Sequence, residues 1–191
     1  MATSKNSAGS HVCTGMRDAI MANTHYRIGM ASESLEIRTS KDLVQALVKA
    51  KKIEVAFEEV LHWRGFLTIV DPETGRLLGS LVQESATHER LVDALIRMVE
   101  PFASTQWETR TAPIVIDGDD EVQFLNKLLE GEDLAYYVYS AILEAMAHLD
   151  PQSVGGIQNA TEMRRVLGQL VSAERRHREL VSQLLAARKS L

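Results

Sequence analysis

The chain has 191 residues, 45% hydrophobic and 25% charged, which is the composition of an ordinary globular protein of about one domain. Its formal net charge of −5 argues against a general nucleic-acid-binding protein. Its single cysteine, Cys13, excludes an intramolecular disulfide and a CxxC metal knuckle.

The first 39 residues are polar, rich in Ser, Thr and Gly, and show no sustained hydrophobic period. We therefore predict a flexible N-terminal segment, 1–39, followed by a folded domain, 40–191. The N-terminus lacks the apolar stretch of a signal peptide, and no run of about 18 apolar residues predicts a membrane span. We expect a reduced, cytoplasmic protein that does not contact membranes.

Four amphipathic segments follow, and the spacing of their apolar residues predicts four α-helices. They run from Ser40 to about Gly65, from about 75 to 100, from just after Asp120 to about 148, and from about 159 to 188. The connections are short, long and short: a turn at 71–75, the stretch 101–119 with a β-like segment at 114–116, and a break at 150–156. This order predicts an all-α four-helix bundle with a long crossover between the second and third helices.

Each predicted helix places a carboxylate near the centre of its apolar face, and two of the helices add a histidine. These residues are Glu54, Glu84, His88, Glu132, Glu174 and His177. On any single helix, a carboxylate that reaches the rim or a histidine bonded to a neighbour is the ordinary explanation. Glu58/His62 and Glu144/His148 have the spacing of Glu84/His88 but lie largely off the apolar face, so we predict that they are solvated pairs.

The six residues also agree in depth. At 1.5 Å per residue, their positions along the four predicted helices match to within a turn. Four carboxylates that converge in a dry core cannot all stay ionised without cations. Two divalent metal ions would balance their charge, and mixed oxygen and nitrogen ligands suit iron or manganese better than structural zinc.

This pattern resembles the ferritin-like di-iron and di-manganese carboxylate proteins, which use one Glu from each of two helices and Glu-x-x-His from the other two. Glu54 and Glu132 correspond to the single carboxylates, and Glu174 with His177 matches the motif. The stretch 178–180 is similar to rubrerythrins, and without a CxxC pair the chain would be a short, rubredoxin-less form. The resemblance implies two iron (or manganese) ions per chain, a homo-oligomer, and redox chemistry on O2, peroxide or Fe(II).

The second helix departs from the motif, because Glu84 and His88 are separated by one residue too many. Either His88 binds from a different angle, or a π-bulge absorbs the extra residue, or one ligand is lost and the site is mononuclear or vestigial. Tyr136 and Tyr139 share the face of Glu132 and could bond a ligand carboxylate, carry an electron, or simply fill the core. Arg178 either bonds a ligand or extends to solvent.

Two other classes of function stay open at this point. A helical bundle that has kept the fold without a metal would serve as an interaction protein, and a bundle that assembles into a shell would store or deliver iron. We expect association through exposed apolar residues, namely Leu67, Ile69, Ile114 and Ile116.

Overall fold

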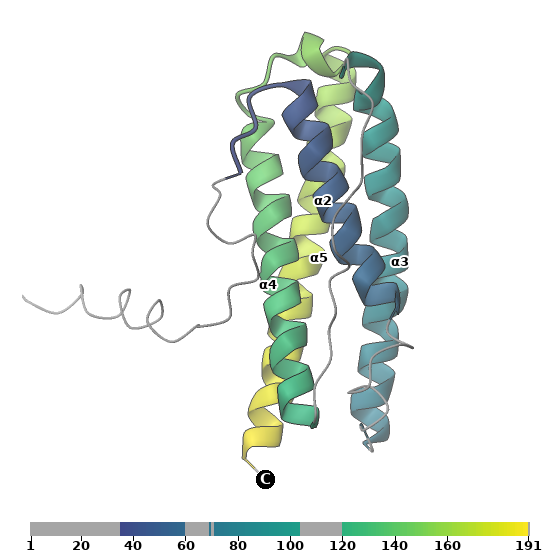
Figure 1. The fold of residues 1–191 in the computed structure, drawn as a ribbon, viewed down its shortest axis with the longest axis vertical. Coiled ribbons are helices and arrows are strands. Elements are labelled where there is room, and N and C mark those ends of the chain that lie inside the picture. Colours follow the sequence, from purple (N-terminus) through teal and green to yellow (C-terminus); the bar gives the residue numbers. More distant parts are fainter. Residues whose placement is uncertain (1–34, 60–68, 70, 104–119, 191) are drawn as a thin grey trace, which may run out of the picture. The chain divides into compact units, whose positions relative to one another are not determined.

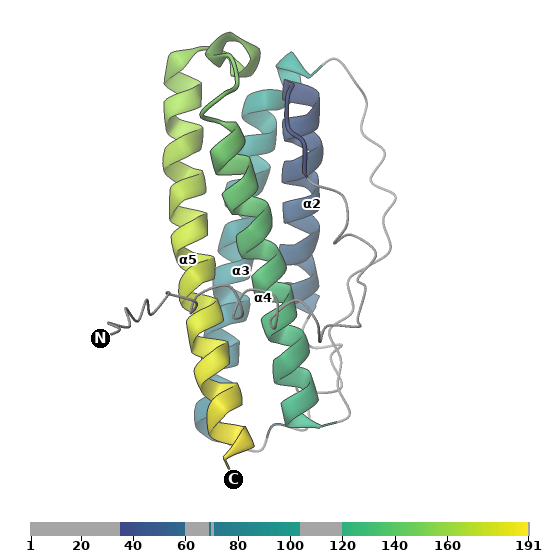
Figure 2. The ribbon, with the colours of Figure 1, turned by 90° about the vertical axis from the view of Figure 1, so that its left-hand side faces the viewer.

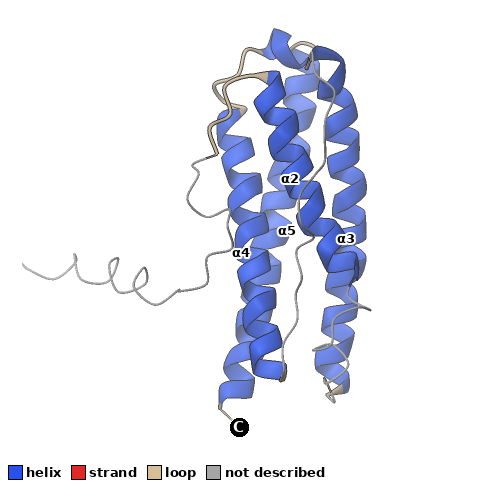
Figure 3. Ribbon diagram, in the orientation of Figure 1, coloured by secondary structure: helices blue, strands red, loops and turns tan. Residues whose placement is uncertain are grey.

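The protein is described here from a computed structural model, in which residues 35–59, 69, 71–103 and 120–190 are described. Within these residues the regular structure is helical (Figure 3). The elements are α2 (Ser40–Glu58), α3 (Pro72–Val99), η3 (Glu100–Phe102), α4 (Glu121–Ala145), η4 (Pro151–Val154) and α5 (Ile157–Lys189), where η denotes a short 3-10 helix. Residues 1–34 of the predicted flexible segment 1–39, the predicted β-like segment 114–116, and Gly65, Leu67 and His62 lie outside the described residues.

The long helices of the described part, α2 to α5, pack as a bundle (Figures 1 and 2). α2 packs antiparallel against α3, and α4 packs antiparallel against α5. α3 and α4 run in the same direction, as the long stretch 104–119 between them requires. The predicted all-α bundle with its long second connection is confirmed.

Side chains at the helix starts explain where the helices begin. Thr39 and Asp42 form a reciprocal capping box at the start of α2, and the Asp120 side chain accepts a hydrogen bond from Gln123 N at the start of α4. α3 begins at Pro72, with the Asp71 side chain accepting from Thr74 N. The prediction of a turn at 71–75 was wrong, because an Asp followed by Pro is also a strong helix start.

The start of α5 depends on glycine. Gly155 and Gly156 have φ angles of +91° and +104°, which side chains with a Cβ rarely adopt. A Cβ on Gly155 would also meet the Phe102 ring at 2.8 Å. This tight turn directs the chain from η4 into α5 two residues earlier than predicted.

The ends of two helices also differ from prediction. α2 ends at Glu58, where Glu59 caps it, although its apolar stripe continues in the sequence to Leu61. α4 ends at Ala145 instead of about 148, and the next residues form a turn. Arg164 of α5 donates hydrogen bonds to the carbonyl oxygen of Met146, which satisfies a carbonyl at this helix end.

The buried face of α3 follows a strict seven-residue pattern. Its buried residues alternate by steps of four and three, at Thr74, Leu78, Leu81, Ser85, His88, Val92, Leu95 and Val99. The predicted stripe included Leu77 and Leu91, both of which are half-buried. The face is therefore rotated by part of a turn from the predicted one, and Ser85 lies at its centre.

Arg188 near the end of α5 ties together the starts of α3 and α4. Its guanidinium donates to Glu121 Oε1 and Thr74 Oγ1 and forms an ion pair of 2.9 Å with Asp71. These contacts hold the helix ends at that side of the bundle in register.

None of the helices in the described residues has the length and apolar character to span a bilayer.

Candidate metal centre

All six predicted site residues lie in one layer of the bundle. α2 contributes Glu54, α3 contributes Glu84 and His88, α4 contributes Glu132, and α5 contributes Glu174 and His177. All of them except Glu84 are buried. Since carboxylates are rarely buried unless they are paired or ligate a metal, this layer needs a specific explanation.

Glu174 lies between the two histidines. Its Oε1 is 2.8 Å from His88 Nδ1, and its Oε2 is 3.6 Å from His177 Nδ1. Among the described residues, these three place a ligand atom each within 4.8 Å of one another, a group that could hold a metal ion. The two imidazole rings are stacked, with centroids 5.5 Å apart and planes inclined by 18°.

Each histidine also faces a second buried carboxylate. His88 Nδ1 is 3.7 Å from Glu54 Oε1, and His177 Nδ1 is 3.4 Å from Glu132 Oε2. The centre therefore has two similar halves, Glu54 with His88 and Glu132 with His177. Glu174 belongs to both halves, with one oxygen toward each.

Several buried atoms in this layer have no hydrogen-bond partner among the described residues. They are Glu54 Oε2, His88 Nδ1, Glu132 Oε2 and Glu174 Oε1. His88 Nδ1 and Glu174 Oε1 are 2.8 Å apart, yet they are not aligned as a hydrogen bond. Two ligand atoms of one metal ion, with bonds of about 2.1 Å at a right angle, lie about 3 Å apart. The donors thus fit a shared cation.

Glu84 takes a different place from the one predicted. Its side chain is 44% exposed, and its Oε2 lies 3.1 Å from His177 Nε2, on the outer side of the ring. The same oxygen pairs with Arg176 at 3.3 Å. A carboxylate there fixes the orientation of the imidazole and leaves Nδ1 directed at the buried layer.

The spacing of Glu84 and His88 is not accommodated by a π-bulge, since α3 is α-helical throughout Pro72–Val99. The position three residues before His88, where the Glu-x-x-His motif has its carboxylate, is occupied by Ser85. Ser85 is buried. Ser85 was not predicted as a buried residue because the predicted face of α3 was rotated. The four-three spacing of the apolar residues of α3 is the signal that would have identified it.

The two tyrosines near the layer have different roles. The Tyr139 hydroxyl donates a 2.6 Å hydrogen bond to Glu54 Oε1 across the core, not to the neighbouring Glu132. Tyr136 is half-buried and lies under the Arg178 guanidinium, which is 4.6 Å from its ring centre and is paired with Asp133. Arg178 therefore extends to the surface and does not contact the buried carboxylates.

The other Glu-x-x-x-His pairs lie apart from this layer where they are described. Glu144 and His148 are both exposed, as predicted. Glu58 is half-buried near Glu89, where burial and the neighbouring carboxylate raise its pKa.

In the absence of a metal, protons keep this layer close to neutral. Burial alone would lower the pKa of each histidine. The facing carboxylates have the larger effect, and they raise the pKa of His88 to about 9 and that of His177 to about 11. Burial raises the pKa of Glu132 to about 8. Burial also opposes ionisation of Glu174, but the two histidines hold its pKa near 2. Metal ions would have to displace the histidine protons in order to bind.

These pKa values predict how the metal-free protein responds to alkali. His88, His177 and Glu132 all bind protons more tightly when folded, so their stabilising contribution is complete below the unfolded-state pKa values and is lost as pH rises from those values to the folded-state pKa values of about 9, 11 and 8. We expect the free energy of unfolding, measured by urea titration with a chelator present, to fall between pH 7 and 9 by about 1.4 kcal/mol per pH unit for each histidine that stays protonated in the folded chain. Glu132 adds to this slope only up to its pKa of about 8. A flat or rising stability over this range would contradict the assignment.

The Tyr139 hydroxyl allows a second test on the metal-free protein. Tyr139→Phe leaves Glu54 Oε1 in the core without its donor, and we expect a loss of about 1–3 kcal/mol in the free energy of unfolding. Tyr137→Phe is the matched control, because Tyr137 lies two residues away on α4 and is 51% exposed. Equal denaturation midpoints for the two variants would show that the Tyr139–Glu54 bond does not stabilise the bundle.

Comparison with known proteins adds no family to these observations. No protein-family model, no curated protein and no solved structure matches the chain. The buried His/Glu layer therefore stands on its own geometry.

Proposed function

We propose that this bundle binds two iron or manganese ions in the buried His/Glu layer and acts as an oxidoreductase of the ferritin-like carboxylate type. The observation that carries the proposal is the position of Glu174, whose two oxygens are directed to different histidines. A carboxylate in that position is suited to bridge two cations, and mixed oxygen and nitrogen donors suit iron or manganese.

The donors divide into two sets that share Glu174. Glu54 and His88 would hold one ion, and Glu132 and His177 would hold the other. Glu54 Oε2 and Glu132 Oε2 are buried and accept no hydrogen bond among the described residues, so each set includes a carboxylate oxygen that a metal ion could take. We assign Glu84 to orienting His177 instead of ligating a metal, because it contacts the outer nitrogen of that ring.

When bound, two such ions supply one-electron redox chemistry that O2 or peroxide can use, or that oxidises Fe(II) as substrate. The chain itself fixes the orientation of the donor side chains and excludes water from them. Phe57, Leu81, Leu128 and Val181 are buried on the four helices within about two turns of the layer and limit the access of water. The Tyr139 hydroxyl fixes the Glu54 carboxylate by a hydrogen bond.

A metal-free interaction bundle is the competing function, and Glu54 Oε2 argues against it, because this buried oxygen has no hydrogen-bond partner among the described residues and His88 faces the other oxygen. A bundle selected only for packing would be expected to satisfy such a buried oxygen with a hydrogen bond or to replace the carboxylate with an apolar group. Storage or delivery of iron would use the same donors and additionally require assembly into a shell. Native mass measurement tests that function and the predicted homo-oligomer together. Ile69, which was predicted to contribute to association, is partly buried against the core of the bundle.

The proposed activity is tested by loading the protein with Fe(II) under anaerobic conditions and then mixing it with O2 or hydrogen peroxide. We expect the optical spectrum to report iron oxidation faster than that of the same Fe(II) in buffer, and this acceleration to be absent in Glu174→Gln. Oxidation at the rate of free Fe(II) would contradict the proposed activity, even if metal is bound.

A further inference from the structure

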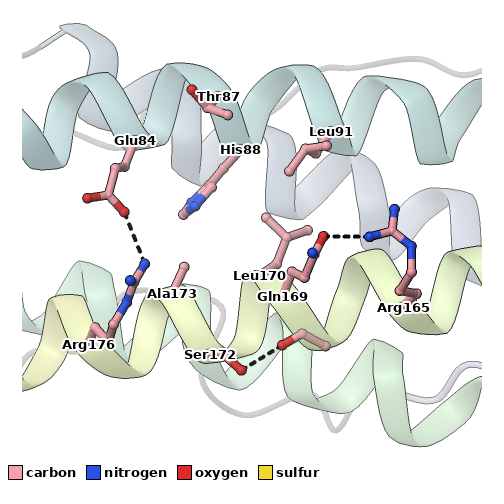
Figure 4. Close-up of a pocket in the computed structure, with 11 residues that line it drawn as sticks. Glu84, Thr87, His88, Leu91, Arg165, Gln169, Leu170, Ser172, Ala173 and Arg176 are labelled. Atoms are coloured by element: carbon pink, nitrogen blue, oxygen red, sulfur yellow. Dashed lines mark hydrogen bonds and ion pairs between the residues drawn. The ribbon is translucent and has the colours of Figure 1, made fainter.

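A groove with a volume of about 590 Å³ lies between α3 and α5 and reaches the buried layer at His88 (Figure 4). α3 lines it with His88 and Leu91, and α5 lines it with Leu170, Ala173 and Arg176. In Figure 4, Leu91 and Leu170 lie on one side of His88, and Glu84 and Arg176 lie on the other. The groove is within the size range of small-molecule sites.

Small residues of α5 keep the groove open. Gly168, Ser172 and Ala173 all line it, and these three residues project no long side chain into the space opposite α3. A Cβ added at Gly168 would meet no heavy atom within 4 Å. His88 is therefore the part of the buried layer that a molecule in the groove approaches.

The groove also carries a cation beside His88. Arg176 forms one ion pair, with Glu84 at 3.3 Å, and among the described residues its guanidinium has no second partner. The other arginine of the groove, Arg165, is already bonded to both oxygens of Glu162 and to Gln169. An anion in the groove would thus bind at the Arg176 end.

With two divalent ions bound, the buried layer would carry an excess positive charge that an anion at the Arg176 end of the groove would balance. Ser85 stands where the motif has a carboxylate, so the buried layer holds the carboxylates of Glu54, Glu132 and Glu174 only, and Glu84 is paired with Arg176. Two divalent ions would carry one positive charge more than these three carboxylates supply. A ligand with a single negative charge would balance it.

Resting on the proposed two-metal function, we propose that this groove binds an aliphatic monocarboxylate. Its carboxylate lies between Arg176 and the metal site at His88, and its chain packs on Leu91 and Leu170. Leu170 and Arg176 are roughly 9 Å apart along α5, a span that a chain of about eight carbons covers. The apolar middle of the groove distinguishes this ligand from an inorganic anion, which would use the Arg176 end alone.

Calorimetric titration of the full chain with sodium octanoate, after Mn(II) loading and measurement of the metal content, tests this proposal. We expect octanoate to bind at least ten-fold more tightly than acetate or inorganic phosphate, and to bind the metal-loaded protein more tightly than the metal-free protein. A chain that takes up no manganese or iron contradicts the proposed function and this inference together. A loaded chain that does not bind octanoate, or binds acetate or phosphate equally well, overturns this inference alone.

Two variants locate the ligand. Gly168→Leu fills the groove, and Arg176→Gln removes the cation, so each should weaken octanoate binding at least ten-fold while the metal content stays unchanged. Arg175→Gln is the matched control, because Arg175 is the preceding residue of α5, is exposed and is paired with Glu179. Equal octanoate affinity in the control and both variants would show that the ligand does not bind in the groove.

Discussion

Glu174→Gln is expected to remove both metal ions, lowering the content from about two per chain to background. The two oxygens of Glu174 are directed to His88 and His177, and among the described residues Glu174 is the carboxylate that belongs to both halves of the centre. The substitution keeps the size of the side chain but removes its charge. Elemental analysis after anaerobic loading and desalting measures the effect.

Two further variants make this result specific. Glu144→Gln changes an exposed carboxylate of α4 and should leave the metal content unchanged. Glu54→Gln affects only the half with His88 and should leave about one ion per chain. Equal metal content in Glu174→Gln and Glu144→Gln would contradict the assignment of Glu174.

Binding of both proposed metal ions is expected to raise the melting temperature of the protein by roughly 10–20 °C when the free ion is at one hundred times its dissociation constant. The buried donors from all four helices meet only in the folded chain, so each ion stabilises that state by about 2.7 kcal/mol. Differential scanning calorimetry with and without Mn(II) measures the shift.

The shift should disappear in Glu174→Gln and persist in Glu144→Gln. A wild-type melting temperature that does not respond to Mn(II) or Fe(II) would favour the metal-free interaction bundle. An equal shift in both variants would place the ion elsewhere on the molecule.

The depth of the site was predictable because helix geometry is regular. A rise of 1.5 Å per residue converts sequence position into height, so Glu54, Glu132 and Glu174 could be assigned to one layer before their contacts were known. The way in which the donors of this layer form two sets around Glu174 could not be predicted from depth alone. Which oxygen of Glu174 faces which histidine depends on how the helices are rotated in the bundle.

The error at Glu84 arose from the residues assigned to the apolar stripe of α3. Leu77 and Leu91, which were included in that stripe, are half-buried, whereas Leu78 and Ser85, which were not, are buried. The residues that are buried centre closer to Ser85 than to Glu84. The pairing of Glu84 with Arg176 could not be predicted either, because they are 92 residues apart.

The partner of Tyr139 shows a similar limit. The sequence placed this residue on the face of Glu132, and it does lie on that face of α4. Its hydroxyl, however, reaches across the core to Glu54 of α2. A long side chain in the centre of a bundle can contact any of the facing helices, so its partner depends on packing.

The most direct test of the account is the metal content of the purified full-length chain, loaded with Fe(II) under anaerobic conditions, freed of unbound metal and analysed together with its optical spectrum after oxidation. The account predicts about two iron ions per chain, with absorption from the oxidised ions, or the same number of manganese ions if Mn(II) is supplied. A chain that retains neither metal would contradict it.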